Sequence, residues 1–424
     1  MSEIFSPANI LLPAADVEPE AWSVIACDQF SSEREYWERV SGKVGEKPST
    51  LNMIIPEAYL EQVDEAKEIR KISGFMNEYV KKGVLREVED SFIYVERTLA
   101  DGRVRKGLVG AVDLEEYDFS GGDAAVLASE GTALDRLPPR IRVRREALLE
   151  LPHIMTFIAD KEASVIEPLA AKAGSLPLLY DFELMEGGGR LKGMRVCGGD
   201  AREVMAALNA LHEKSGSLDM RNGASSHLAT RRCLMIMGDG NHSLAAAKTY
   251  WDELKQSLSA GERENHPARR ALLEVNNVYD DAISFEAIHR VIFDIDADDF
   301  AAAFAKAIKA GDDYALRLIR AGSETTVNAS AGCIGDIIGK VQSFLDDYLS
   351  KKGGRIDYIH GSETAAKIAE ENGCAAIILP SMNKSDFFDT VSARGIFPRK
   401  AFSVGHARDK RYYMECRRIT MHNA

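Results

Sequence analysis

The chain has 424 residues, of which 45% are hydrophobic and 28% are charged, and its formal net charge is −13. This composition is that of an ordinary globular protein, and no stretch reaches the roughly 18 apolar residues of a membrane span. The acidity argues against a nucleic-acid partner, because such binding depends on neutralising phosphates. The N-terminal residues do not follow a signal-peptide pattern, and the six cysteines lack metal-type spacing. We therefore expect a cytoplasmic protein; the sequence leaves its oligomeric state open.

In chain order, the pattern of apolar residues predicts two glycine-turned hairpins, a buried strand between them, and a helix after them. These elements span 91–117 with a turn at 100–102, 153–160, 176–198 with a turn at 187–189, and 200–216. Two further strands are expected at 266–280 and 285–295.

From about residue 297 the chain changes to alternating helical and strand patterns, which favours a smaller α/β layer. The segment RYYMECRRIT (411–420) predicts a closing C-terminal strand. We therefore expect an α+β protein with a main domain over 1–296 and a smaller region over 297–424.

The stretch MGDGNHSLAAAK (237–248) lies between an apolar run and an amphipathic pattern. The sequence predicts a buried strand over Cys233–Met237, with Asn241 as the N-cap of a following helix. That helix spans Leu244–Leu258, and Lys248 points away from the loop. The buried side chains expected on this helix are Leu244, Ala247, Trp251 and Leu254.

A strand, a glycine-containing loop and a helix start together form a common anion site, because free N–H groups and the helix dipole attract negative charge. Gly238 and Gly240 would let the backbone approach a phosphate closely. Asp239 could hold a metal ion or accept a proton, and His242 could contact phosphate or transfer a proton. The alternative is a capped turn whose polar side chains are only solvated.

Two other segments carry residues of the kinds that catalytic sites use. In SEGTALDRLPPR (129–140), Glu130 could act as a general base, or the segment could be a loop with an Asp135–Arg136 ion pair. If Arg140, Arg142 and Arg144 were in extended chain, they would share one face and suit an anion; alternatively they would be a solvated face or pair with acidic neighbours. Further candidates are Asp28 at a strand end, beside Cys27 as a core residue, and the cations Arg290, Arg399 and Lys400.

Several stretches in order resemble the bacterial and archaeal family known as domain of unknown function 1015. They are WSVIACDQFSSEREYW, SEGTALDRLPPR, LLYDFEL, GDGNHS, HPARRALLEVNNVYD, FEAIHRVIF and FPRKAFSVG. The Asp-Gly-x-His loop also resembles that of the ParB/sulfiredoxin-like superfamily, which includes a free serine kinase. This resemblance implies a mixed-sheet core whose loop holds nucleotide phosphates. Asn241 and Ser243 stand where the commoner pattern has His and Arg, which removes a bidentate phosphate donor.

The resemblance and the loop together favour phosphoryl transfer that involves a phosphorylated small molecule, such as serine or its phosphate. A nucleotide would bind at Gly238, Gly240, Asn241 and Ser243, with Mg²⁺ near Asp239 and with Glu130, Asp239 and His242 as catalytic residues. The cations expected to neutralise developing charge are Arg136, Arg290 and Lys400. The alternatives are a non-catalytic nucleotide sensor and a ParB-like DNA-associated factor.

Overall fold

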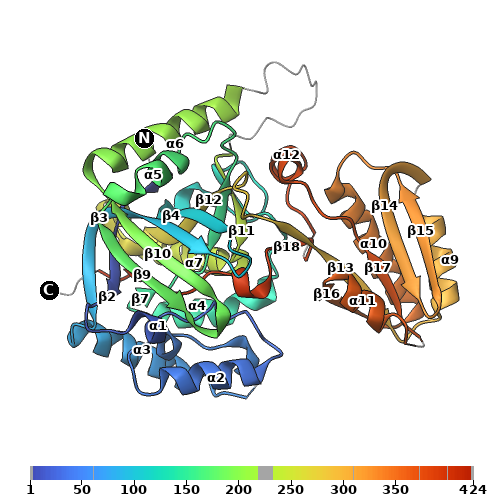
Figure 1. Ribbon diagram of the computed structural model, residues 1–424, viewed down its shortest axis with the longest axis horizontal. Coiled ribbons are helices and arrows are strands. Elements are labelled where there is room, and N and C mark those ends of the chain that lie inside the picture. Colours follow the sequence, from blue (N-terminus) through green and yellow to red (C-terminus); the bar gives the residue numbers. More distant parts are fainter. Residues whose placement is uncertain are drawn as a thin grey trace. The chain divides into compact units, whose positions relative to one another are not determined.

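The computed structural model describes residues 3–60, 62–217, 233–308, 310–371, 373–398 and 400–421 (Figure 1). The chain forms two compact units. Unit 1 comprises 1–128, 132–283 and 406–424, and unit 2 comprises 129–131 and 284–405. This division differs from the expected boundary at 296/297, because unit 2 already includes strand β13 (Phe285–Phe293) and the residues from His406 onward belong to unit 1. No helix in the described part of the chain is long and apolar enough to cross a membrane.

The described residues of unit 1 form an eleven-stranded mixed sheet in the order β5-β6-β11-β8-β12-β4-β3-β10-β9, with β1 on β4 and β2 on β3. The pairs β5–β6, β6–β11 and β8–β12 are parallel, and the others are antiparallel. A separate pair joins β7 (Leu149–Glu150) to β19 (Arg417–Arg418). The eleven strands are β1 (Phe5–Ser6), β2 (Ala8–Pro13), β3 (Leu85–Thr98), β4 (Val104–Asp113), β5 (Tyr117–Asp118), β6 (Val126–Leu127), β8 (Met155–Ile158), β9 (Leu178–Leu184), β10 (Gly189–Val196), β11 (Met235–Asp239) and β12 (Arg270–Asn277).

Helices pack on both faces of this sheet. Alternate strand residues point to opposite sides, and both sets are apolar here, so each face needs a cover. On β3, Phe92 and Tyr94 belong to one hydrophobic cluster with α5, α6 and α7, whereas Ile93 and Val95 belong to another with α2, α3 and the C-terminal segment. The helices of unit 1 are α1 (Pro19–Trp22), α2 (Arg34–Val44), α3 (Glu65–Lys81), α4 (Leu137–Glu146), α5 (Glu167–Ala171), α6 (Gly198–Ser217), α7 (Asn241–Leu254) and α8 (Ala260–Asn265).

Unit 2 is built on an antiparallel sheet in the order β15-β14-β17-β13-β16, with β18 on β13. Ala365 and Ala369 at α11 pack on Val291 and Ala376 of the sheet, and α9 meets α10 through aromatic contacts such as the edge-to-face pair of Phe300 and Tyr348. Its elements are β13 (Phe285–Phe293), α9 (Ala297–Ala307), β14 (Ala310–Arg320), β15 (Ser323–Ala329), α10 (Ile334–Lys352), β16 (Arg355–His360), α11 (Ser362–Ile368), β17 (Ala375–Ile378), α12 (Lys384–Arg394) and β18 (Phe402–Val404).

The α+β class with a mixed sheet is confirmed, as are both hairpins and the helix expected over 200–216. Two local predictions are wrong. The arginines at 140, 142 and 144 lie in helix α4, which prolines start and whose Leu137 and Ile141 pack on α7. The tail is a strand only at Arg417–Arg418, because its other residues pair singly with separate segments, as Tyr412 does with Ile25.

Candidate functional site

The two glycines of the loop between β11 and α7 are explained by packing. Gly238 lies at a register shift in the β11–β8 pairing, and a Cβ there would come within 2.4 Å of the Phe157 ring. Gly240 has a φ of +79° and is the N-cap of α7, so Asn241 is the first helical residue and not the cap. A Cβ on Gly240 would approach Ile154 Cα to 3.0 Å. Both positions therefore need glycine whether or not a ligand binds.

Helix α7 is held firmly beyond its first turn. Leu244, Ala247 and Trp251 are buried as predicted, while Leu254 is only partly buried. The predicted strand before the loop is buried from Cys233 onward, although its pairing begins at Met235.

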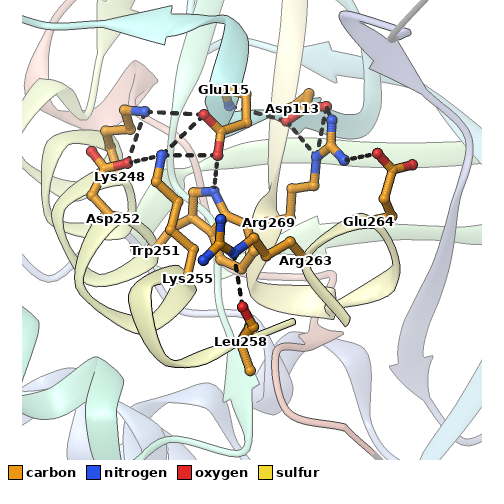
Figure 2. Close-up of polar contacts among 10 residues, drawn as sticks. All are labelled: Asp113, Glu115, Lys248, Trp251, Asp252, Lys255, Leu258, Arg263, Glu264 and Arg269. Atoms are coloured by element: carbon orange, nitrogen blue, oxygen red, sulfur yellow. Dashed lines mark hydrogen bonds and ion pairs between the residues drawn. The ribbon is translucent and has the colours of Figure 1, made fainter. Parts of the chain in front are cut away.

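Figure 2 shows polar contacts around the second half of α7, which we call the distal network. It comprises Asp113, Glu115, Lys248, Trp251, Asp252, Lys255 and Arg269. Glu115 accepts hydrogen bonds from Trp251 Nε1 at 2.7 Å and from Lys255 Nζ at 3.0 Å. Lys248 pairs with Asp252 at 3.1 Å, and so points away from the loop as expected. Beside it, Arg269 pairs with Asp113 at 2.8 Å. The positive and negative charges of the distal network therefore pair with one another. None of these pairs involves a residue of the first turn of α7.

Just before the first turn of α7, Asp239 at the end of β11 faces a buried lysine, Lys410, that no sequence motif indicated. Lys410 Nζ lies 3.2 Å from Asp239 Oδ2, and the lysine side chain is 8% exposed. The other carboxylate oxygen accepts the Gly240 N–H at 2.9 Å. His242 Nε2 accepts the N–H of Ala133 at 3.2 Å, which requires that nitrogen to be unprotonated. The segment preceding α4 therefore meets the start of α7.

A second histidine completes this arrangement. His153 Nε2 lies 3.3 Å from Ser243 Oγ and 3.7 Å from Asp28 Oδ2, and its Nδ1 lies 3.0 Å from the Tyr413 hydroxyl. Burial acts to raise the pKa of Asp28, but His153, a hydrogen bond from Gln29 and Lys410 lower it below its usual value. Asp28 is therefore ionised at neutral pH. Burial raises the pKa of the neighbouring Cys27 thiol to about 12, so that group is not a thiolate nucleophile.

We call this set of polar side chains the α7-start cluster. It comprises Asp28, His153, Asp239, His242, Ser243, Lys410 and Tyr413.

Buried backbone and charge contacts bring these distant segments together. Tyr413 donates its N–H to Val24 O at 2.8 Å, and Ala26 donates to Arg411 O at 3.0 Å, so the C-terminal segment lies against the residues before Asp28. The Arg411 guanidinium pairs with Glu274 at 2.8 Å and donates to the carbonyl of Pro152, next to His153. No local sequence motif identifies His153, Lys410 or Tyr413 as site residues. Of the residues gathered here from outside the loop, only Asp28, in the stretch CDQF, was a candidate from the sequence.

A cavity of about 200 Å³ adjoins the cluster, and Ser243 and His153 line one part of it. Arg140 and Arg144 of helix α4 also line the cavity. Of the roles considered for the three arginines of 140–144, pairing with acidic neighbours is the one found. Arg140 pairs with Glu57 at 2.5 Å, Arg142 with Glu65 at 2.8 Å and Arg144 with Glu150 at 2.7 Å.

The other predicted site residues fall into two groups. Asp135 and Arg136 are exposed in unit 1, at a 3₁₀ turn over Leu134–Arg136. Glu130, Arg290 and Lys400 belong to unit 2. The prediction that Glu130 shares one cleft with the Asp239 loop therefore stays a prediction. Arg399 lies outside the described residues.

Within unit 2, the Glu130 carboxylate accepts three backbone N–H groups, from Lys400 at 3.2 Å, Ala401 at 2.9 Å and Phe402 at 3.3 Å. Burial raises its pKa and outweighs these hydrogen bonds. Arg290 is fully buried with its guanidinium 5.2 Å from the Tyr358 ring centre, and burial lowers its pKa to about 10. Its Nε and Nη2 have no hydrogen-bond partner among the described residues.

The side chains of the α7-start cluster do not fit a resident Mg²⁺. In the described residues, no three His, Cys, Asp or Glu side chains gather closely enough to hold a metal ion. The Asp239 carboxylate, expected to be the metal ligand, instead pairs with the Lys410 ammonium. A protein-held Mg²⁺ would need more oxygen ligands than Asp239 supplies.

Among solved structures, similarity is found to a free serine kinase in complex with AMP, at 9% identity over 72% of this chain and 90% of that one, with a TM-score of 0.37. C-terminally truncated SbnI from Staphylococcus aureus matches at 8% identity over 70% and 82%, with a TM-score of 0.36. A conserved hypothetical protein from Pyrococcus furiosus matches at 14% identity over 44% and 75%, with a TM-score of 0.30. No curated protein matches.

The family expected from the sequence motifs is confirmed. The model of the family described as protein of unknown function DUF1015 matches residues 8–373, which is most of the chain. The protein therefore belongs to the DUF1015 family.

Proposed function

We propose that unit 1 binds a phosphate-bearing small molecule at the start of α7 and transfers its phosphoryl group to or from a hydroxylated metabolite. The observation that carries this proposal is the buried Lys410 ammonium, which pairs with Asp239 at the N-terminus of a 14-residue helix. A helix start and a desolvated cation both favour an anion. The backbone of Gly238, Gly240 and Asn241 and the side chains of His242 and Ser243 would complete the phosphate site.

His153 is the best-supported candidate for the general base. It is 6% exposed, and Asp28 and Tyr413 hold its ring beside Ser243. In this scheme its imidazole accepts the proton of the acceptor hydroxyl as that oxygen bonds to the phosphorus. The bond from the phosphorus to the donor's bridging oxygen breaks, and the donor leaves with that electron pair. Lys410 then stabilises the negative charge on the transferred group, and the proton returns to the leaving oxygen in the reverse direction.

Two of the assignments made from the sequence remain alternatives within the same proposal. Glu130 could serve as the base, but its carboxylate would first have to release N–H groups that now donate to it. Arg136, Arg290 and Lys400 remain candidates for neutralising charge. We propose no protein-held Mg²⁺ and no step through one.

The ligand class includes nucleotides, because one of the similar structures is a free serine kinase that contains AMP. Serine and its phosphate are the corresponding acceptor and product to test. The second candidate function is a nucleotide sensor, which keeps the phosphate site and performs no transfer. A DNA-associated factor is disfavoured by the net charge of −13.

A ligand-stabilisation screen with ATP, ADP, AMP, phosphoserine and inorganic phosphate tests the proposal. A ligand at 100 times its dissociation constant adds about 2.7 kcal/mol to the free energy of unfolding, which raises the melting temperature by several degrees. The Lys248→Ala variant should keep this stabilisation, because Lys248 belongs to the distal network. Lys410→Met should lose it.

Turnover then separates the two candidate functions. Phosphoryl transfer to a hydroxylated acceptor, or release of phosphate from its phosphate ester, should occur in the wild type and fall by at least about a hundredfold in His153→Asn. Stabilisation without any turnover would identify a sensor. If millimolar concentrations of every phosphate-bearing probe left the melting temperature unchanged, the proposal would be wrong.

A further inference from the structure

The cavity beside the α7-start cluster is apolar over most of its surface. Its volume is about 200 Å³, and it lies among α3, α4, α7 and β12. The apolar side chains that line its wall include Met53, Ile72, Met76, Val143, Ala246 and Leu272. Leu272, Ile72 and Met76 also belong to a hydrophobic core cluster of unit 1, so this wall is fixed by packing.

The charged side chains at the cavity compensate one another. Arg140 pairs with Glu57 at 2.5 Å, and Arg144 pairs with Glu150 at 2.7 Å. The Glu150 carboxylate also accepts the Leu272 N–H at 2.9 Å and the Arg417 guanidinium at 2.7 Å. These ion pairs therefore offer little to a charged ligand, whereas Ser243 and His153 supply polar groups toward the cluster.

The volume of the cavity indicates the size of its occupant. An engineered apolar protein cavity of about 150 Å³ binds benzene. Scaling by volume, 200 Å³ accommodates roughly eight carbon atoms, such as an aromatic ring with a two-carbon chain. An amino acid is a poor match, because its ammonium and carboxylate would lose water against aliphatic walls without gaining partners.

We propose that this cavity binds the apolar part of the substrate, an aromatic or aliphatic group of roughly eight carbons. The hydroxyl or phosphate at its end then reaches Ser243 and His153. This inference rests on the proposed function for the identity of that polar end. It replaces serine with an apolar alcohol, or its phosphate ester, as the substrate class.

Binding of three small probes by the full chain, measured by calorimetry, tests the inference. 2-Phenylethyl phosphate should bind at least about a hundredfold more tightly than methyl phosphate, since each buried methylene contributes appreciably to affinity. 2-Phenylethanol should also bind, more weakly than its phosphate. Equal affinities for the two phosphates would overturn the inference and leave the proposed function intact. Binding of 2-phenylethanol alone would support the apolar cavity and contradict the phosphate site, and binding of none would overturn both.

Variants on α4 locate the bound group. Val143→Phe places a ring in the cavity and should reduce the advantage of 2-phenylethyl phosphate to below about threefold, with methyl phosphate binding unchanged. The matched control Arg145→Phe adds the same ring at an exposed position of the same helix and should keep the full advantage. An advantage that survives in Val143→Phe would overturn the assignment to this cavity.

A second variant keeps the test decisive if Val143→Phe does not fold. Met76→Ala enlarges the cavity and should improve binding of 4-phenylbutyl phosphate relative to 2-phenylethyl phosphate by at least about threefold. An unchanged ratio between these two probes would contradict the inference.

Discussion

The two ends of helix α7 carry lysine–carboxylate pairs in opposite settings. In the distal network, Lys255 and Lys248 share Glu115 and Asp252, and Glu115 is 37% exposed (Figure 2). At the start of the helix, Lys410 and Asp239 form a pair in which the lysine side chain is 8% exposed. Exposed pairs contribute little to stability, whereas buried charges cost free energy unless some other gain offsets it.

The difference indicates where function lies along α7. The distal network also joins segments far apart in the chain, since Glu115 contacts Trp251 and Lys255, but its carboxylates Glu115 and Asp252 are 37% and 39% exposed. The α7-start cluster draws its polar groups from the segments around residues 28, 153, 240 and 410, which only the folded chain brings together. Substitutions at the far end should therefore change stability, and those at the start should change ligand binding.

The largest expected effect is that of Trp251→Ala. Trp251 is 1% exposed, packs in the hydrophobic core and donates its Nε1–H to Glu115 at 2.7 Å. Truncation should lower the free energy of unfolding by about 3–5 kcal/mol, measured by urea denaturation. Trp251→Phe, which keeps most of the packing, should lose less than half as much. A loss below about 1 kcal/mol in the alanine variant would show that the distal half of α7 is not a stability element.

Lys410→Met sharpens the comparison at the start of the helix. Losing one charge-assisted contact should weaken binding of a phosphate-bearing ligand by about 1.5–3 kcal/mol, which is roughly ten- to a hundredfold. The matched control is Lys255→Met, which removes a lysine from the distal network and should leave the dissociation constant within about twofold of wild type. Calorimetric titration measures both. Equal losses in the two variants would remove the distinction between the ends.

His242→Ala should affect binding more than folding. It removes the acceptor of the Ala133 N–H, which costs about 0.5–1.5 kcal/mol of stability and a few degrees in melting temperature. Affinity for the phosphate-bearing ligand should fall at least about tenfold. If the variant unfolds while binding per folded molecule stays unchanged, the loop is only a capped turn.

Glu115→Gln should have the smallest effect, below about 1 kcal/mol, and high salt should remove it. Burial acts to raise the pKa of Glu115, but hydrogen bonds from Lys255 and Trp251 lower it below its usual value. Because the folded pKa lies below the unfolded one, the contribution is fully present above about pH 5 and disappears as the pH falls through the folded value. Urea denaturation of both proteins at pH 7 and pH 3 checks this, and a difference that grows toward pH 3 would contradict it.

Local features of the fold were predictable from the sequence. Glycine turns fixed both hairpins, with Gly102 and Gly189 at φ of +85° and +81°. The 3.6-residue period located α7, which runs from Asn241 to Leu254 and not to Leu258, and three of its four expected buried side chains. The pattern failed at Arg140–Arg144, because alternating arginines fit a strand as well as a helix, and the i, i+4 pair Leu137 and Ile141 decided the outcome.

The candidate site was only half predictable. The Asp-Gly-Asn-His-Ser loop is local, so its position at a helix start followed from neighbouring residues. His153, Lys410 and Tyr413 are as much as 260 residues apart in the chain and reach the loop through pairing that no sequence period encodes. For the same reason, the sequence did not predict that the C-terminal residues belong to unit 1. A single sequence carries no signal for which distant segments pair.

The most direct test of the central claim is a crystal structure of the protein soaked with tungstate, a phosphate-shaped anion whose anomalous signal identifies it. We predict one strong peak within hydrogen-bonding distance of the Lys410 ammonium and the first N–H groups of α7. The Lys410→Met crystal should lack that peak. A wild-type structure in which tungstate occupies only the distal network, or no site in unit 1 at saturating concentration, would contradict the account.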